Sequence, residues 1–477
     1  MAQIVIEVPD ALKPLLDKPL RGFVKAVAAQ MREGERGRRV DYRQFEVKLA
    51  ARTAALERAG HQATLSALDI DAAHVSINEE RYARVGRHPE DYKTPAGPVE
   101  VWRSLYRRCG ERNGATVNTV TLRSGAVADE WLPETAKQMA HLLQQGTSRE
   151  AEDTARRMGR LPYSRSSFER VGHALGEMYV PRHHDIEEEL IRAFEVPGEA
   201  KSVSVSIDRV SLPMEEPRAR PPGRPRKNAP KKPVQRKFRM AYCGTVTMHD
   251  ADGKALHTIR YGAMPATGAD SLVTSLASDI VALREQRPGL DIMKLCDGAA
   301  EMWGLLDAEF DEETFGRTYS LIDFWHLIEK LSAAANALHG DDEARAVTKR
   351  WKLRLLNCNA AASEILDELT ASGKEHVSVG KDSPVHDAMT YLENNGHRMQ
   401  YATARRRGLP IGSGNVEATC KTLVGQRMKR AGSRWKTASG DHVLHLRALS
   451  LSDRWNQAMN ITLRPTPVRI QLAQCSG

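Results

Sequence analysis

Residues 202–210 have the sequence SVSVSIDRV, which alternates small polar side chains with valine and isoleucine. Successive side chains of a strand point to opposite faces, so this alternation predicts a half-buried β-strand. Asp208 lies near the end of the pattern. A carboxylate inside an apolar strand is costly unless it is exposed, paired or bound to a metal ion. The segment therefore predicts a strand with a polar site close to its end.

The residues that follow predict an alternation of strands and helices. We expect strands at 238–248, 255–264, 291–295 and 318–322, a turn at 249–253, and helices at 271–287, from 298 through 306, and from 323 onward. The order β-β-β-α-β-α-β-α is typical of an α/β RNase H-like domain, whose mixed five-stranded sheet has three antiparallel strands followed by parallel ones with crossover helices. Residues 325–405 are helical in pattern and predict an inserted helical bundle.

A second acid, Asp297, directly follows the strand predicted at 291–295, in the sequence LCDG. Open α/β sheets place their ligand sites at the carboxyl ends of parallel strands. In the predicted topology the strand ends that carry Asp208 and Asp297 are neighbours, although 89 residues separate them (297 minus 208). We therefore expect the two carboxylates to meet.

The third acid is Glu417, in the segment GSGNVEATCKTLVGQRMKRAGSRW at 412–435. The glycines predict a helix start, and the recurrence of Val416, Cys420, Val424 and Met428 at helical spacing predicts an inward stripe beside Glu417. An acid in the first turn suits the helix dipole. A surface ion pair with Lys421 at i,i+4 is the simpler alternative for Glu417.

Three carboxylates form a set of hard oxygen ligands that suits Mg²⁺ or Mn²⁺. Two such ions roughly 3.5–4 Å apart would serve phosphodiester chemistry by in-line displacement. The six cysteines include no CxxC pair, so we expect neither a zinc ribbon nor a disulfide framework. This cysteine pattern fits a protein of a reducing compartment. No apolar run is long enough for a membrane span and the first residues do not resemble a signal peptide, so a cytoplasmic, nucleoid-associated location is expected.

Positive charge is concentrated near the candidate acids. The formal net charge is +9, with ten Lys/Arg and no acids at 217–239 and six more basic residues, again without acids, at 421–436. We interpret 217–239 as a DNA-gripping arm, with a disordered loop as the alternative. The residues predicted to contact DNA are Arg165, Arg170, Arg224, Arg226, Lys227, Lys231, Lys232, Trp325, Lys421, Arg427, Lys429, Arg430 and Arg434.

The N-terminal part carries little recognisable chemistry. Residues 1–95 are predicted to be mostly helical, with strands at 99–108 and 116–124. Helices predicted at 134–145, 150–158 and 167–177 resemble a helix-turn-helix, and an ordinary helical hairpin is the alternative. The expected divisions are a helical region 1–130, a helix-turn-helix region 131–200, a catalytic domain 201–324, a helical insertion 325–408, the last catalytic helix 409–460 and a tail 461–477.

Four motifs resemble those of the Kra-type bacterial insertion-sequence transposases, DDE enzymes related to the Mutator-like group. They are IDRV around Asp208, LCDGAAEMW around Asp297, LIDFWHLIEKL at 321–331 and the 412–435 segment. The resemblance covers about residues 200–460. It implies that Asp208, Asp297 and Glu417 hold two Mg²⁺ or Mn²⁺ ions, and that the chain cuts and joins DNA at the terminal inverted repeats of a mobile element, as a homo-oligomer assembled on double-stranded DNA.

Asp323 and His326 resemble the (C/D)xxH element of these enzymes. The resemblance assigns His326 to positioning DNA or a scissile phosphate, with Asp323 as its support or as a rival metal ligand. A helix N-cap at Asp323 with His326 in the first turn is the local alternative. Trp325 is interpreted either as a stacking partner for a flipped base or as a core residue.

Three other functions fit parts of the pattern. A DNA-binding regulator would use the helix-turn-helix but would leave the three acids without a role. A metal-dependent nuclease or resolvase of the same fold would cut without joining, and an inactive transposase descendant would do neither.

Overall fold

The computed structural model describes residues 1–477 except 1–4, 6, 37–38, 216–235, 266 and 473–477. The chain forms two compact units, which are described separately. Unit 1 comprises Met1–Tyr179 and Met459–Gly477, and unit 2 comprises Val180–Ala458. The predicted boundary between the helix-turn-helix region and the catalytic domain, at residue 200, lies inside unit 2.

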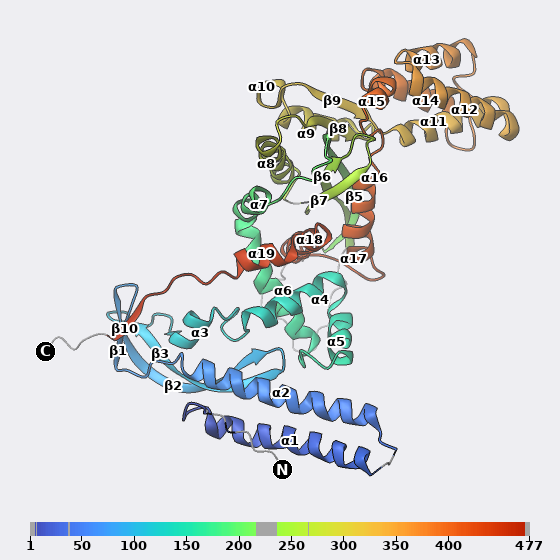
Figure 1. Ribbon diagram of the computed structural model, residues 1–477. Helices are drawn as coiled ribbons and strands as arrows, with labels where there is room; N and C mark the ends of the chain where they lie inside the picture. The colour runs from blue at the N-terminus through green and yellow to red at the C-terminus, as the bar shows by residue number, and fades with distance from the viewer. Residues whose placement is uncertain (1–4, 6, 37–38, 216–235, 266, 473–477) are drawn as a thin grey trace, which may run out of the picture. The chain divides into compact units, whose positions relative to one another are not determined.

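Unit 1 contains helices and an antiparallel sheet (Figure 1). Its helices are α1 (Lys13–Glu35), α2 (Tyr42–Ser66), α3 (Thr119–Ser124), α4 (Pro133–Gln145), α5 (Ser148–Arg157) and α6 (Arg165–Tyr179). Its strands are β1 (His74–Ile77), β2 (Glu80–Thr94), β3 (Gly97–Arg108), β4 (Val117–Asn118) and β10 (Ile470–Leu472), in the order β10-β1-β2-β3-β4.

Several predictions for this unit were wrong. Strands β1 and β2 lie in the region expected to be mostly helical, and residues 119–124 form a helix where a strand was expected. The sequence of β2, ERYARVGRHPEDYKT, is charged and contains proline, so it lacks the apolar alternation of a half-buried strand. Residues 461–477 were predicted to be a tail, but they contain the three-residue strand β10, which pairs with β1.

The predicted helices at 134–177 are confirmed as α4, α5 and α6. Thr147 caps α5 in a capping box with Glu150, which satisfies backbone N–H groups at both positions. Met139 of α4 and Phe168 of α6 belong to one buried cluster. Close packing of α4 on α6 depends on Gly172, where a Cβ atom would lie 2.3 Å from Leu143.

Unit 2 is built on a mixed five-stranded sheet in the order β7-β6-β5-β8-β9. Its strands are β5 (Ser202–Glu215), β6 (Arg236–His249), β7 (Ala255–Ala263), β8 (Asp291–Cys296) and β9 (Thr318–Ile322). Strands β5, β6 and β7 are antiparallel, whereas β8 is parallel to β5 and to β9. Strand order and directions agree with those predicted for the sheet.

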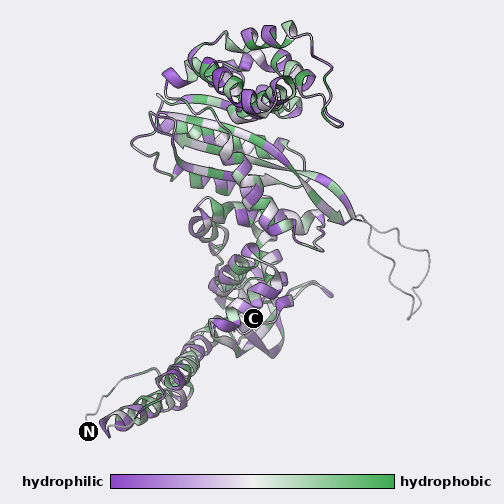
Figure 2. Ribbon diagram, turned by 90° about the vertical axis from the view of Figure 1, so that its right-hand side faces the viewer, coloured by the Kyte–Doolittle hydropathy of each residue, from purple (hydrophilic) through white to green (hydrophobic). Residues whose placement is uncertain are grey.

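Helices pack on both faces of this sheet, and each face has its own buried cluster. Many residues of the strands are hydrophobic (Figure 2). On one face α8 (Asp270–Gln286) packs where Gly244 leaves room for Leu272 and Leu276. On the other face Leu423 packs against Gly262. The alternating serines of β5 are therefore buried under the second layer of helices and do not face solvent as a half-buried strand would require. That layer comes from residues more than 200 positions later, which local alternation cannot reveal.

The remaining elements of unit 2 surround the sheet. They are η1 (Val180–Arg182), α7 (His183–Arg192), α9 (Ala300–Glu309), α10 (Glu312–Phe315), α11 (Phe324–His339), α12 (Asp341–Asn357), α13 (Ala361–Ala371), α14 (Pro384–Asn395), η2 (Gly396–Arg398), α15 (Tyr401–Arg406), α16 (Gly414–Thr419), η3 (Cys420–Gly425), α17 (Gln426–Met428), α18 (Thr437–Leu451) and the start of α19 (Trp455–Thr462). Helices α11 to α15 confirm the helical character that was predicted for residues 325–405. Among the helices of the described ranges, none combines the length and apolar character that a bilayer crossing requires.

Candidate active site

Asp208 lies in the middle of β5, because the strand continues to Glu215 and is longer than predicted. Pairing of β5 with the parallel strand β8 ends at Val205 and Lys294, whereas pairing with β6 continues past Asp208. Asp208 is therefore at the point where β5 loses its parallel neighbour, and it is half-buried. Its direct partner on β6 is Cys243, so its side chain faces the layer that contains α16 and η3.

Asp297 is the first residue after β8. Its Oδ1 accepts a hydrogen bond from the Ala299 backbone N–H at 3.0 Å, and its carbonyl accepts one from Trp303 Nε1 at 2.7 Å. Both bonds fix the turn that leads into α9. Just before this turn, the Ile207 backbone N–H donates to Cys296 Sγ at 3.2 Å, and the Cys296 thiol donates to the Ile207 carbonyl at 3.2 Å. These two hydrogen bonds connect β5 and β8 next to the acids.

Glu417 lies in α16, which is followed without a break by the π-helical turn η3. Such wide turns are rare and are frequent at functional sites. The stripe predicted beside Glu417 is buried, with Val416, Cys420 and Val424 inside the cluster that covers the sheet. Glu417 itself remains about one-third exposed, with Lys421 Nζ at 3.9 Å in the ion pair that the sequence suggested.

The structure brings all three acids to one cavity of about 330 Å³. It is lined by Ile207, Asp208, Arg209, Val210, Asp297, His326, Ser413, Val416, Glu417, Cys420, Lys421, Gly425 and Lys429. These residues come from β5, the end of β8, the start of α11 and the α16–α17 segment, all in unit 2 (Figure 1).

The donor set of this cavity fits hard divalent cations, because its three acids offer only carboxylate oxygens. Asp208, Asp297 and Glu417 are not among the described groups of three whose ligand atoms all lie within 4.8 Å of one another. A site for two ions about 3.5–4 Å apart does not need such a tight cluster, because its carboxylates are shared between two centres. Asp323, His326 and Glu417 do form a tight group.

Asp323 is the N-cap of α11, as one of the two interpretations of the sequence predicted. It also contacts His326 through both the backbone and the ring. Its Oδ1 accepts from the His326 backbone N–H at 2.8 Å, and its Oδ2 accepts from the Ser413 hydroxyl at 2.9 Å and from the Ser413 backbone N–H. Burial raises the pKa of this carboxyl, but the hydrogen bonds from His326 and Ser413 outweigh it and leave the pKa below its ordinary value. With three donors and almost no exposure, Asp323 is less available to a metal ion than Glu417.

His326 lies between two acids. Its Nδ1 is 3.3 Å from Asp323 Oδ1 and 3.6 Å from Glu417 Oε1. The interaction with Asp323 raises the pKa of His326 to about 9, and Glu417 adds to the shift. Without a metal ion the imidazole is therefore protonated at neutral pH, and it can donate a hydrogen bond to an anionic oxygen in the cavity.

Trp325 is half-exposed and is not a core residue. One part of the indole lies against Gly412, where a Cβ atom would be 3.0 Å from Cδ1. The ammonium of Lys352 lies 4.3 Å from the ring centroid, in a cation–π contact. A nucleobase that stacked on this face would have to displace Lys352.

Five basic residues of the 421–436 segment were predicted to contact DNA, and they differ in how far they are exposed to solvent. Lys421 and Lys429 are exposed and line the cavity, and Arg434 is exposed and paired with Glu215 at 3.3 Å. Arg430 is half-buried, and its Nε donates to the Gln426 carbonyl at 3.1 Å.

Arg427 differs from the other four because it is buried. Its guanidinium lies 5.1 Å from the centroid of the Trp435 ring. Its side chain therefore packs inside the fold.

Two other residues predicted to contact DNA, Arg165 and Arg170, belong to unit 1. Arg165 is exposed at the start of α6 in unit 1. Arg170 on the same helix pairs with Glu130 at 2.8 Å and lies over the Trp131 ring, so part of its charge is neutralised. Arg224, Arg226, Lys227, Lys231 and Lys232 lie outside the described residues.

Sequence reasoning missed three contributors to the site. Cys420, expected only as a core residue, donates its thiol to Asp208 Oδ2 at 3.3 Å. Arg209 lines the cavity and pairs with Glu301, which also accepts from the Tyr242 hydroxyl at 2.8 Å. Ser413 holds Asp323. The glycines around Ser413 were a usable signal, but nothing local marks the contact of Cys420 with an acid 212 residues earlier.

Comparisons with solved structures give faint likenesses. No family model and no curated protein matches the chain. The Drosophila P element transposase strand transfer complex is 11% identical over 69% of this chain and 82% of that chain, with a TM-score of 0.22. The Mos1 transposase paired-end complex with left transposon end is 14% identical over 58% and 79%, with a TM-score of 0.15. Likeness at this level does not establish a shared fold or a shared activity.

Proposed function

We propose that unit 2 is the RNase H-like catalytic domain of a DDE transposase that cuts and joins DNA with Asp208, Asp297 and Glu417 as its metal ligands. The observation that carries this proposal is the convergence of the three acids on one cavity from β5, the end of β8 and α16. A regulator without chemistry has no use for this convergence, because a shared anionic pocket disfavours DNA unless cations bind there.

The carboxylates hold the ions, and the remaining residues position DNA. When Mg²⁺ or Mn²⁺ is bound, it activates water or a 3′-hydroxyl and stabilises the leaving oxygen of an in-line displacement. Asp208 and Asp297, on adjacent strands, provide the rigid part of the ligand set. Glu417 completes it from a helix whose first turn favours a negative charge. No general base is required from the protein.

His326 and the two cavity lysines act on the phosphate. The His326 imidazole lies beside Glu417, and a ring N–H can donate a hydrogen bond to a non-bridging oxygen of the scissile phosphate. Asp323 positions the ring through the start of α11. Lys421 and Lys429 are exposed at the cavity and contact the flanking phosphates.

We assign the chain to the Kra-type bacterial insertion-sequence enzymes on the four motifs around the acids. The DNA substrate is then the pair of terminal inverted repeats of the element, held by a homo-oligomer. We propose that α4, α5 and α6 of unit 1 recognise these ends, with the basic segment 217–239 as an additional phosphate-binding arm.

The deciding experiment offers the full-length protein labelled duplexes that carry the DNA flanking its coding sequence, with Mg²⁺, Mn²⁺ or chelator. A transposase yields metal-dependent strand cleavage and, with a target plasmid, covalent joining of the cut 3′ ends. Cleavage without joining would identify a nuclease. Specific binding with no metal-dependent cleavage under any condition would overturn the proposal in favour of a regulator or an inactive descendant.

A further inference from the structure

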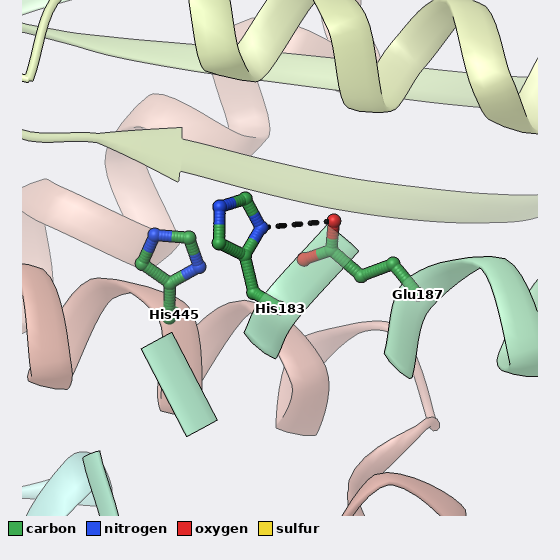
Figure 3. A group of neighbouring side chains, drawn as sticks. All are labelled: His183, Glu187 and His445. Carbon is green, nitrogen blue, oxygen red and sulfur yellow. Dashed lines mark hydrogen bonds and ion pairs between the residues drawn. The ribbon is translucent and has the colours of Figure 1, made fainter. Parts of the chain in front are cut away.

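A second cluster of side chains that could ligate a metal ion lies in unit 2. The helices that carry it do not contribute to the cavity lined by Asp208, Asp297 and Glu417. His183 and Glu187 belong to α7 and His445 belongs to α18 (Figure 3). One ligand atom from each residue lies within 4.8 Å of the others. The spacing of four residues places His183 and Glu187 on the same face of α7. Three potential ligands are thus gathered from segments about 260 residues apart in the chain.

The distances are close to those of a tetrahedral site. Two ligands that are each about 2.0–2.1 Å from a tetrahedral ion are about 3.3 Å apart. His183 Nδ1 and Glu187 Oε2 are 3.2 Å apart. The His445 ring lies beside that of His183, with a centroid separation of 4.7 Å. All three ligand atoms lie within 4.8 Å of one another.

Outer hydrogen bonds orient these ligands. The other ring nitrogen of His183, Nε2, is 3.4 Å from the Ser271 hydroxyl, so Nδ1 is the atom turned toward Glu187. Ser275 donates its hydroxyl to Glu187 Oε2 at 2.8 Å. Both serines belong to α8. Bonds of this kind to ligating histidines and carboxylates are characteristic of metal sites, where they set the tautomer and the orientation of the ligand.

A second cavity, lined by carboxylates, adjoins the cluster at Glu187, whereas His183 and His445 do not line it. Glu187 is almost fully buried but lines a cavity of about 610 Å³ between α7, α8 and the α9–α10 segment. Seven acids and one arginine line this cavity: Asp185, Glu187, Glu188, Asp279, Glu285, Glu309, Asp311 and Arg192. An excess of carboxylates draws cations toward Glu187.

We propose that His183, Glu187 and His445 form a binding site for a divalent transition-metal ion of the zinc class. Two imidazoles and one carboxylate suit Zn²⁺ and its neighbours, whereas Mg²⁺ prefers oxygen ligands alone. The ion joins α7 to α18, which flank the sheet from opposite ends of the unit 2 sequence. The site is distinct from the cavity that Asp208, Asp297 and Glu417 line, and it does not depend on the function proposed for that cavity.

The test measures zinc binding by the full-length, untagged protein after it is stripped with a chelator. Because His326 and Glu417 could also bind zinc, the Glu417→Gln variant is the reference protein. It is titrated with Zn²⁺ in competition with a chromophoric chelator, in excess Mg²⁺. We expect it to bind one ion, and its thermal midpoint to rise on addition of Zn²⁺.

Further substitutions then assign the ligands. Adding Glu187→Gln or His445→Asn should weaken binding by at least about tenfold and abolish the thermal shift. Adding His397→Asn should change neither, because this exposed histidine lies outside both clusters.

Co²⁺ makes the test independent of whether the variants fold. In the reference protein, Co²⁺ should give visible absorption bands of a low-symmetry, four- or five-coordinate ion. Absence of a bound ion in the reference protein would overturn the proposal. An affinity that is the same with and without Glu187→Gln, in folded protein, would overturn it as well.

Discussion

Asp208 and Asp297 follow the same register across the parallel pair β5 and β8, with Asp208 inside β5 and Asp297 one residue past the end of β8. Partners on β5 and β8 differ by 89 residues (294 minus 205), and the same number separates the two acids (297 minus 208). Paired positions of parallel strands face the same side of a sheet, and the same register, continued three residues past the last pair of Val205 with Lys294, matches Asp208 with Asp297. A slip of one residue would turn one acid to the opposite face. The pairing of β5 with β8 therefore positions the first two ligands of the candidate site.

We expect Asp208→Asn, Asp297→Asn and Glu417→Gln each to lower DNA cleavage by at least about 10³-fold, because each removes a charged ligand but keeps the shape of the side chain. DNA binding in the absence of metal should be unchanged or slightly stronger, because one negative charge is lost. Cleavage kinetics and fluorescence anisotropy measure the two effects. A variant that cleaves at the wild-type rate would remove its residue from the site.

Replacing Gly298 tests whether close packing next to Asp297 contributes to the stability of the protein. A Cβ atom at this position would lie 2.3 Å from the Tyr391 ring, so Gly298→Ala should cost about 1–3 kcal/mol and displace the Asp297 turn. Adding Tyr391→Leu should restore part of the loss, which a double-mutant cycle would detect as non-additivity.

A matched control for this cycle is available on α9. A Cβ atom added at Gly304 would have no heavy atom of a neighbouring residue within 4 Å, so Gly304→Ala should stabilise the helix by about 0.5–1 kcal/mol. Chemical denaturation measures the unfolding free energy of every variant. Strict additivity of the two substitutions at Gly298 and Tyr391 would show that the ring yields without cost.

The sequence was most informative where structure is local. Each strand of the unit 2 sheet contains a run rich in apolar residues, and the order of these runs along the chain predicted three antiparallel strands followed by parallel ones. The contact of Cys420 with Asp208 and the fit of Tyr391 over Gly298 connect distant segments, so no spacing rule could find them. Strand β2 was missed because most of its side chains are exposed or half-buried and its charged sequence has no apolar face.

Thiol reactivity should separate the five described cysteines into two classes. Cys109 and Cys358 are exposed, whereas Cys243, Cys296 and Cys420 are buried. The neighbouring Cys243 thiol and burial raise the pKa of Cys420, and burial raises the pKa of Cys296, so neither forms thiolate at pH 8. Iodoacetamide followed by peptide mass spectrometry should label Cys109 and Cys358 within minutes and spare the other three until denaturant is added. Rapid labelling of Cys420 in native protein would contradict its contact with Asp208.

The exposed and buried cations of the 421–436 segment should behave differently toward salt. Lys429 lines the cavity and is exposed, so Lys429→Ala should weaken DNA binding and reduce the slope of log affinity against log salt by about 1. Arg427→Ala should leave that slope unchanged and lower the melting temperature, because Arg427 packs on Trp435. Titrations at several salt concentrations measure the slope, and a reduced slope for Arg427→Ala would place this residue on the phosphate instead.

Unit 2 should lose stability in mild acid because of His249. The ring is buried, with Nε2 2.8 Å from the Ser204 hydroxyl and Nδ1 3.2 Å from the Gly253 carbonyl, and burial lowers the pKa of His249 to about 4. Above about pH 6.5, the ordinary pKa of histidine, the ring is neutral in both folded and unfolded chains, so its contribution is fully present. Between about pH 6.5 and 4 only the unfolded chain takes up the proton, and up to about 3 kcal/mol is lost.

Below about pH 4 the folded chain also binds the proton, and the loss from this group stops. His249→Gln cannot titrate, so its unfolding free energy should fall less steeply than that of the wild type between about pH 6.5 and 4. Other buried histidines contribute equally to both proteins, and the difference between the two slopes isolates His249. Parallel slopes in urea unfolding across this range would mean that His249 accepts its proton at the same pH in the folded and the unfolded chain, which its burial between β5 and the β6–β7 turn does not allow.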